Sequence, residues 1–121
     1  FTRPSKIDVD ITVELLVDET YVGDTQLKDA VVNYIGGVAS DGEETLGLGV
    51  GDNVRIDELR DVLVNEENGV VGLDYSVDGD PLSTTPTKTT INGLEVISIA
   101  ENEVAQTDAT DTSISIITRE Y

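Results

Sequence analysis

The sequence predicts an α+β fold: a two-layer sandwich in which two helices pack on one face of a small, mostly antiparallel sheet. Three observations lead to this prediction. They are an alternating apolar segment over residues 7–17, a helical stripe over residues 27–38, and a second short helix that precedes another alternating segment. The expected order is strand, helix, helix, strand, strand. The 121 residues suit a single domain, 1–121, with one hydrophobic core.

Residues 7–17 are the most regular segment of the chain. The odd positions are all apolar: Ile7, Val9, Ile11, Val13, Leu15 and Val17. Most even positions are polar: Asp8, Asp10, Thr12 and Glu14. Because successive side chains of a strand point to opposite faces, this pattern predicts one apolar face and one acidic face. We expect the apolar face to pack on the helices and the acidic face to meet water or a partner.

Two helices are expected after this strand. The first spans Thr25–Val38 and is capped by Asp24, whose carboxylate can accept hydrogen bonds from the first turn. Its apolar residues recur at helical spacing: Leu27, Ala30, Val31, Tyr34, Ile35 and Val38. The second helix starts near Asp57 and ends at Asn68 and Gly69. We expect its Leu59 and Leu63 to pack beside the first helix against the strand.

The hydrophobic pattern is less regular in the second half of the chain, so fewer elements can be predicted there. Residues 71–77 alternate as a strand, and residues 94–100 are apolar with a mixed period. Residues 78–93 hold Pro81 and Pro86 among polar residues, which predicts an exposed, flexible excursion. Residues 101–112 are polar, and the segment 112–118 is expected to be the last strand.

The strongest compositional signal is charge. There are 25 acidic and 7 basic residues, which gives a net charge of −18. Such a surface repels nucleic acid and anionic membranes, because a phosphate backbone must be neutralised by cations. The periodic segments argue against disorder, the other interpretation of a highly charged chain. We therefore expect a folded protein from a salt-rich cytoplasm, with salt ions at its surface, where a Debye length of about 3 Å screens repulsion.

Several kinds of chemistry are excluded by composition. The chain has no Cys and no His, which rules out disulfides, zinc bound by Cys or His, and catalytic triads that use histidine. No stretch reaches the ~20 apolar residues that a membrane span needs. No cluster of Ser, Tyr, Lys or carboxylates stands out as a catalytic centre. We expect no enzyme activity and no cofactor.

The best metal candidates lie in a segment that is similar to the first half of a calcium loop. Asp74, Ser76 and Asp78 occupy positions one, three and five, with Gly79 at position six and Asp80 as a further acidic candidate. Position twelve should be a bidentate Glu, but Thr85 stands there. A turn at Asp78-Gly79 is therefore the preferred interpretation. A calcium-binding or small-ligand regulatory domain remains the alternative function.

Other motifs have structural explanations that we prefer. The run Gly47-x-Gly49-x-Gly51 invites comparison with a phosphate loop but lacks the Gly-Lys-Ser/Thr ending, so a flexible loop is expected. Two groups of carboxylates could serve acid–base or metal chemistry but are better explained as solvated surface: Asp8, Asp10 and Glu14 in the first strand, and Asp57, Glu58 and Asp61 in the second helix.

Three stretches of the chain together resemble a known family. The first is the opening strand and helix over residues 7–38. The second is Gly49-Val-Gly-Asp-Asn-Val-Arg-Ile-Asp-Glu-Leu-Arg-Asp-Val-Leu63, followed by Gly69-Val-Val-Gly-Leu-Asp74. The third is Ile99-Ala-Glu-Asn-Glu-Val-Ala105 before the last strand. This order is similar to the C-terminal domain of the baseplate J family of contractile phage tails and related injection systems.

The resemblance implies a structural role. It implies a domain of the baseplate wedge that packs against other baseplate and tail subunits, with copies of itself as an alternative partner, and it carries over no catalytic residues. We expect the chain to be the C-terminal piece of a larger baseplate protein, cytoplasmic during assembly and then part of the tail. With the salt signal, a halophilic archaeon or its provirus is the expected source. Residues 106–111 stand where the family pattern has a glycine.

Overall fold

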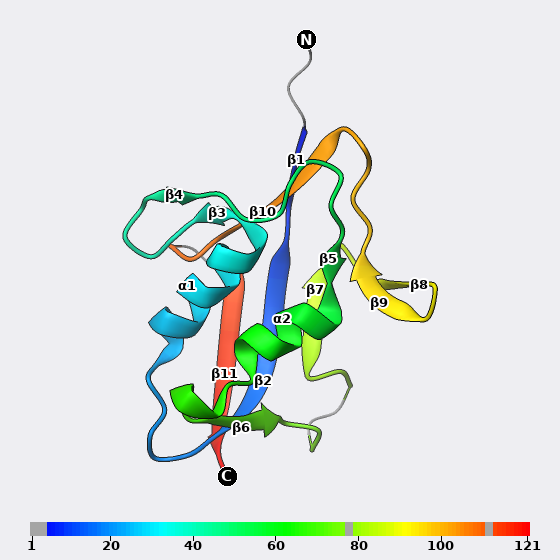
Figure 1. Ribbon diagram of the computed structural model, residues 1–121. Helices are drawn as coiled ribbons and strands as arrows, with labels where there is room; N and C mark the ends of the chain where they lie inside the picture. The colour runs from blue at the N-terminus through cyan, green and yellow to red at the C-terminus, as the bar shows by residue number, and fades with distance from the viewer. Residues whose placement is uncertain (1–4, 77–78, 111–112) are drawn as a thin grey trace.

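The computed structural model describes residues 5–76, 79–110 and 113–121, and it confirms a mixed α+β class (Figure 1). Two helices cross a set of strands that belong to three sheets. The elements in chain order are β1 (Ser5–Asp8), β2 (Asp10–Val17), α1 (Asp24–Ile35), β3 (Gly37–Val38), β4 (Glu44–Thr45), β5 (Val54–Arg55), α2 (Ile56–Leu63), β6 (Val70–Leu73), β7 (Leu82–Thr85), β8 (Thr89–Ile91), β9 (Leu94–Ile97), β10 (Glu103–Asp108) and β11 (Ile114–Glu120).

The predicted first strand is present but is shared between two sheets. It divides at Val9 into β1, which pairs in parallel with β10, and β2, which pairs in parallel with β11. Ser5 is opposite Glu103, and Ile11 is opposite Ile114, so the offset between partners changes from 98 to 103 residues. The C-terminal partner segment therefore has five more residues than the first strand over this stretch. They follow Gln106, after which β10 leaves β1 and pairs with β3.

The predicted apolar face of residues 7–17 is confirmed from Val9 onward. Val9, Ile11, Val13, Leu15 and Val17 are all buried, whereas Asp10 and Thr12 are exposed. Both helices lie over one face of the sheet that contains β2 and β11 (Figure 1). The helix residues that join this core are Leu27, Val31, Val32, Ile35, Ile56, Leu59 and Leu63. Burial of apolar side chains is therefore the force that holds the two helices on the sheet.

Both helix starts differ from the prediction. Gly23, not Asp24, precedes α1 as its cap residue, and the Asp24 carboxylate instead accepts a hydrogen bond from the Tyr21 hydroxyl. In the same way Arg55 precedes α2, so Asp57 lies inside the first turn. Helix α1 ends at Ile35, because Gly36 takes a positive φ of 100° that terminates the helix, as the Gly36-Gly37 pair in the sequence predicts. Val38, the last residue of the predicted stripe, therefore lies beyond the helix in β3.

The expectation of one small sheet in the order strand, helix, helix, strand, strand is not confirmed, because the strands belong to three sheets and follow a longer order. Most pairings of the described strands are antiparallel, as expected: β2–β6, β2–β7, β3–β4, β5–β9 and β8–β9. The longest ladder, β2–β11, is nevertheless parallel, and so are β1–β10 and β10–β3. Alternation predicts which face of a strand is buried, but it carries no information on the direction of the neighbouring strand.

Besides the two-residue strands β3, β4 and β5, three longer strands lie where the sequence predicts none. Residues 78–93, expected to be an excursion, contain β7, which pairs with β2, and β8, which pairs with β9. The polar stretch 101–112 contains β10. Their apolar pattern is faint: β7 buries Leu82 alone, and β10 buries only Ala105 and Thr107. Threonine is β-branched and favours strands, which accounts for the Thr-rich β7 and β8.

The remaining predicted strands are partly recovered. Strand β6 ends at Leu73, before the predicted end at residue 77, and β9 ends at Ile97. Residues 77, 78 and 112, on which parts of these predictions fall, lie outside the described residues. Within the described ranges neither helix has the length and apolar character needed to cross a membrane.

Candidate functional site

Two carboxylates of the predicted calcium loop, Asp74 and Asp80, pair with different basic side chains of the protein. Asp74 is only 4% exposed, and its Oδ1 accepts hydrogen bonds from the Ser76 amide at 3.1 Å, the Ser76 hydroxyl at 2.6 Å and the Arg119 guanidinium at 3.0 Å. Asp80 accepts a hydrogen bond from the Leu82 amide and pairs with Lys88. Asp78 lies outside the described residues. Among those that are described, no three acidic side chains gather closely enough to hold a metal ion.

The pKa shifts of these groups follow from their partners. The Ser76 hydroxyl and amide, with Arg119, hold the pKa of Asp74 below its usual value. Partial burial acts to raise the pKa of Asp80, but hydrogen bonds from Lys88 and the Leu82 amide outweigh it, and that pKa is lowered. Burial acts to lower the pKa of Lys88, and its contacts with the two carboxylates of Asp80 and Glu95 raise it instead. Each group is thus stabilised in its charged form.

The acidic residues of the first strand do not converge on one point. Asp8 and Asp10 are exposed, and Glu14 is half-buried on the sheet face opposite the helices. Asp8 accepts a hydrogen bond from the Gln106 side chain of the neighbouring strand β10. Alternate residues of a strand lie almost 7 Å apart, too far for neighbouring carboxylates to share one ion directly.

The acidic residues of α2 have a local partner. Arg55, directly before the helix, forms ion pairs with Asp57 at 2.7 Å and with Glu58 at 3.2 Å. The Arg55 contact holds the pKa of Asp57 below its usual value. Asp61, further along the helix, is exposed. These carboxylates anchor Arg55 at the helix start, where the helix dipole also favours negative charge.

The glycine-rich loop is tied to the fold by its backbone. A Cβ added at Gly47 would lie 2.4 Å from backbone atoms of both Ile35 and Gly36, at the end of α1. The Gly49 amide donates to the Asp52 carboxylate, and the Gly51 amide donates to the Glu103 carbonyl of β10. Gly47 therefore serves close packing of the loop backbone against α1.

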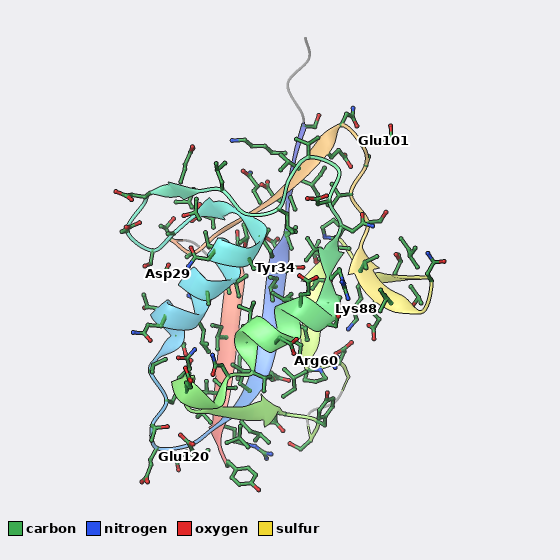
Figure 2. All side chains as sticks on the ribbon, in the orientation of Figure 1. Asp29, Tyr34, Arg60, Lys88, Glu101 and Glu120 are labelled. Carbon is green, nitrogen blue, oxygen red and sulfur yellow. The ribbon has the colours of Figure 1, made fainter. Side chains whose placement is uncertain are left out.

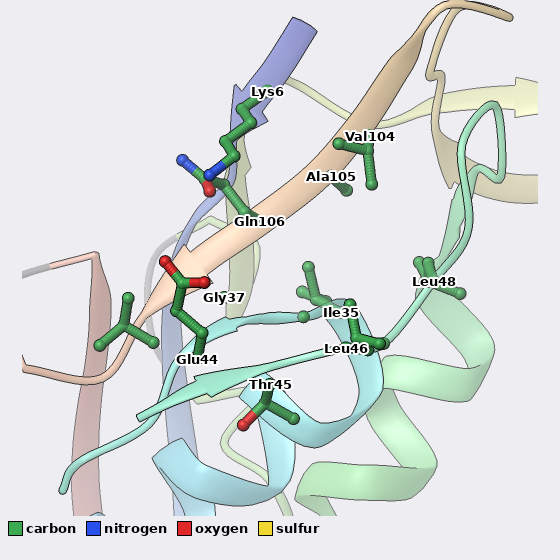
Figure 3. A pocket seen from close by; sticks show the side chains of 13 residues that line it. Lys6, Ile35, Gly37, Glu44, Thr45, Leu46, Leu48, Val104, Ala105 and Gln106 are labelled. Carbon is green, nitrogen blue, oxygen red and sulfur yellow. The ribbon is translucent and has the colours of Figure 1, made fainter. Parts of the chain in front are cut away.

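A groove lies beside this loop, on the sheet with strand order β1-β10-β3-β4. Its volume is about 310 Å³. Its apolar lining comes from Ile35, Val38, Leu46, Leu48, Val104 and Ala105. Lys6 and Gln106 reach over it from one side and Glu44 from the other (Figure 3). Sequence reasoning missed this groove, although Leu46 gave a signal as an apolar residue within a polar, glycine-rich stretch.

A second groove, of about 410 Å³, lies between α1, β5 and the β8–β9 hairpin. The Tyr34 hydroxyl, between α1 and β5, accepts a hydrogen bond from the Arg55 amide at 3.0 Å (Figure 2). Burial raises the pKa of Tyr34. Ile91 and Leu94 face each other across the hairpin and are 40% and 43% exposed. Among the polar residues of its lining, Arg55 pairs with Glu58 at 3.2 Å, while Asp52 and Asn53 accept hydrogen bonds from backbone amides.

The outer face of the central sheet, opposite the helices, is open. Register places Ile117 beside Glu14, and Arg119 beside Leu16. Ile117 is 49% exposed, and Arg119 reaches across β2 to Asp74. Parallel strands are usually covered on both faces, yet within the described ranges the β2–β11 ladder is covered on one. Around the Arg119–Asp74 ion pair this face carries the apolar Leu16 and Ile117 and the polar Thr12, Glu14 and Ser115.

A scan of the sequence against models of known protein families finds no match. A search among curated proteins likewise finds no match.

Proposed function

We propose that this chain is a structural assembly domain, the C-terminal part of a baseplate J-like protein, which packs against other subunits of a phage-like tail or injection particle. The proposal rests on the family resemblance of residues 7–117 and on one structural observation. That observation is the open outer face of the β2–β11 ladder, where Ile117 remains half exposed beside the Arg119–Asp74 ion pair.

The physical basis of the proposal is the burial of that face. In the proposed two-layer domain the helices cover one side of the sheet, and a neighbouring subunit covers the other. Apolar and arginine side chains near the centre of an interface contribute most of its stability. High salt screens the net charge of −18, so acidic surfaces can approach one another. The domain would then act by shape and contact alone, in the cytoplasm during assembly and afterwards in the particle.

Co-expression with the genes that flank its own tests this proposal. The chain should enter a ring or tail particle, and Ile117→Asp should reduce its incorporation because a charge would face the neighbouring subunit. Val22→Asp is the matched control, since Val22 is 40% exposed and lies before α1, away from the outer face. Equal incorporation of the Ile117 variant and the control would contradict the assigned surface.

A further inference from the structure

Leu46 is an exposed apolar residue whose backbone is held in place. It is 98% exposed, but the backbone is held on both sides of it. Thr45 pairs with Gly37 in the β3–β4 ladder. Gly47 packs against the end of α1, and the Leu48 amide donates to the Ile35 carbonyl at 3.1 Å. The fold thus presents Leu46 to solvent at a defined position, and no rearrangement is needed before a partner can bury it.

The groove that Leu46 borders is shaped to receive such a side chain. Val38 and Val104 contribute to its apolar lining, and its volume of about 310 Å³ exceeds what one leucine side chain fills. A protruding leucine and an apolar groove therefore lie side by side on one surface. An interface between identical copies uses the same patch on both, so each copy must carry both the protruding and the receiving part.

The two charged residues beside the groove, Lys6 and Glu44, are also placed so that two copies of the chain can pair. Lys6 lies on β1 and Glu44 on β4, the two outer strands of the sheet. Neither forms an ion pair with another described residue, whereas Arg55, Lys88 and Arg119 all do. When the two-fold axis runs midway between Lys6 and Glu44, perpendicular to the line that joins them, Lys6 of each copy faces Glu44 of the other. Opposite charges on the two sides therefore specify a second copy in antiparallel orientation.

We propose that this groove binds a second copy of the chain through a two-fold interface, in which Leu46 of each copy enters the groove of the other and Lys6 pairs with Glu44. This inference rests on the proposed function, for which it names one partner and its surface. Because each copy carries a net charge of −18, the dimer forms at molar salt, where long-range repulsion is screened and contacts of a few ångströms persist.

Sedimentation of the chain across a series of protein concentrations in 2 M KCl tests the apolar part of the interface. The unaltered chain should dimerise, and Leu46→Asp should weaken dimerisation by about thirtyfold or more, as expected for a central contact. Val50→Asp is the control, because Val50 is in the same loop, is 53% exposed and does not line the groove. A chain that stays monomeric at every salt concentration, or equal weakening by the two substitutions, would overturn the inference.

A charge exchange tests the two-fold pairing. Lys6→Glu and Glu44→Lys should each weaken self-association, because like charges then meet at both contacts. A mixture of the two variants should form a heterodimer, since every contact regains opposite charges. Lys28→Glu mixed with Glu19→Lys makes the same changes in net charge away from the groove. If mixing Lys6→Glu with Glu44→Lys restores association no more than this control mixture does, the pairing of Lys6 with Glu44 is overturned.

The outcomes separate this inference from the proposed function. Particle incorporation is tested through Ile117 on a different sheet, and dimerisation through Leu46. A chain that enters particles but never dimerises would leave the proposed function intact and overturn the inference. If Leu46→Asp leaves the dimer intact but blocks binding of a purified neighbouring tail subunit, that subunit occupies the groove and the inference is likewise overturned.

Discussion

The guanidinium of Arg119 lies 3.0 Å from the carboxylate of Asp74, although 45 residues separate them in the sequence. Arg119 is in β11 and Asp74 follows β6, so the ion pair spans the outer face of β2, which lies between these strands. The pair joins the last strand of the chain to the middle of the fold. The ion pair also engages the Asp74 carboxylate, which would be the first ligand of the predicted calcium loop.

The hydrogen bonds that Asp74 accepts from Ser76, together with this ion pair, make stability depend on pH in the acid range. The pKa of Asp74 is lowered in the folded state, so its contribution is complete above the unfolded value of 3.8 and is lost as pH falls through the lower folded value. We expect Asp74→Asn to reduce the free energy of unfolding near pH 6 and to have progressively less effect below about pH 4. Urea unfolding at a series of pH values measures this difference.

The exposed Asp10→Asn is the matched control for that experiment, since Asp10 lies on the same sheet and is solvated. A difference between the unaltered chain and Asp74→Asn that stays constant down to pH 2 would contradict the role given to the ionised carboxylate.

The apolar face of the first strand should not tolerate charge. Val13 is completely buried, and Val13→Asp would place an unpaired carboxylate in the core. We expect a loss of more than about 4 kcal/mol, close to the whole stability of a marginally stable domain. Asp10→Asn should leave the circular dichroism spectrum and the melting temperature unchanged. A folded Val13→Asp protein with a melting temperature near that of the unaltered chain would show that the strand is not central to the core.

Gly47 should be required for packing of the loop against α1. A Cβ there would meet the backbone of Ile35 and Gly36 at 2.4 Å, so Gly47→Ala forces the loop away and should cost about 1–3 kcal/mol. Gly72→Ala is the control, because a Cβ at Gly72 meets nothing within 4 Å. Thermal unfolding of both variants provides the measurement, and equal melting temperatures would contradict the close approach.

Folding should strengthen with salt. The chain repels itself through its net charge of −18 when this is unscreened, so its melting temperature should rise from low to molar KCl. Differential scanning calorimetry across this range measures the effect. A melting temperature that is flat or falls would remove the argument for a salt-rich origin.

The sequence predicted the parts of the fold in which burial follows a strong period. The odd residues of β2 join the core as expected, and so do Leu27, Val31 and Ile35 of α1 and Leu59 and Leu63 of α2. Ala30 and Val38 of the predicted stripe do not, and Val32 takes a core position that the stripe did not include. Strands β7 and β10 were not predicted. Each buries only one or two residues, and their places are fixed by pairing with β2 and β1, which are distant in the sequence.

The functional surfaces were harder to predict. The acidic strand face was correctly expected to point away from the helices, but its neighbours Ile117 and Arg119 come from a strand whose parallel register depends on long-range pairing. Leu46 could be noticed only as an isolated apolar residue. Its exposure depends on the packing of Gly47 against α1, since that contact fixes the direction of the loop.

Electron microscopy of particles assembled from this chain and the products of its neighbouring genes tests the central proposal most directly. The account predicts density for the domain in a ring or at a tail baseplate, together with reduced incorporation of Ile117→Asp relative to Val22→Asp. A chain that is folded and abundant but never enters a ring or tail particle would contradict the proposed structural role.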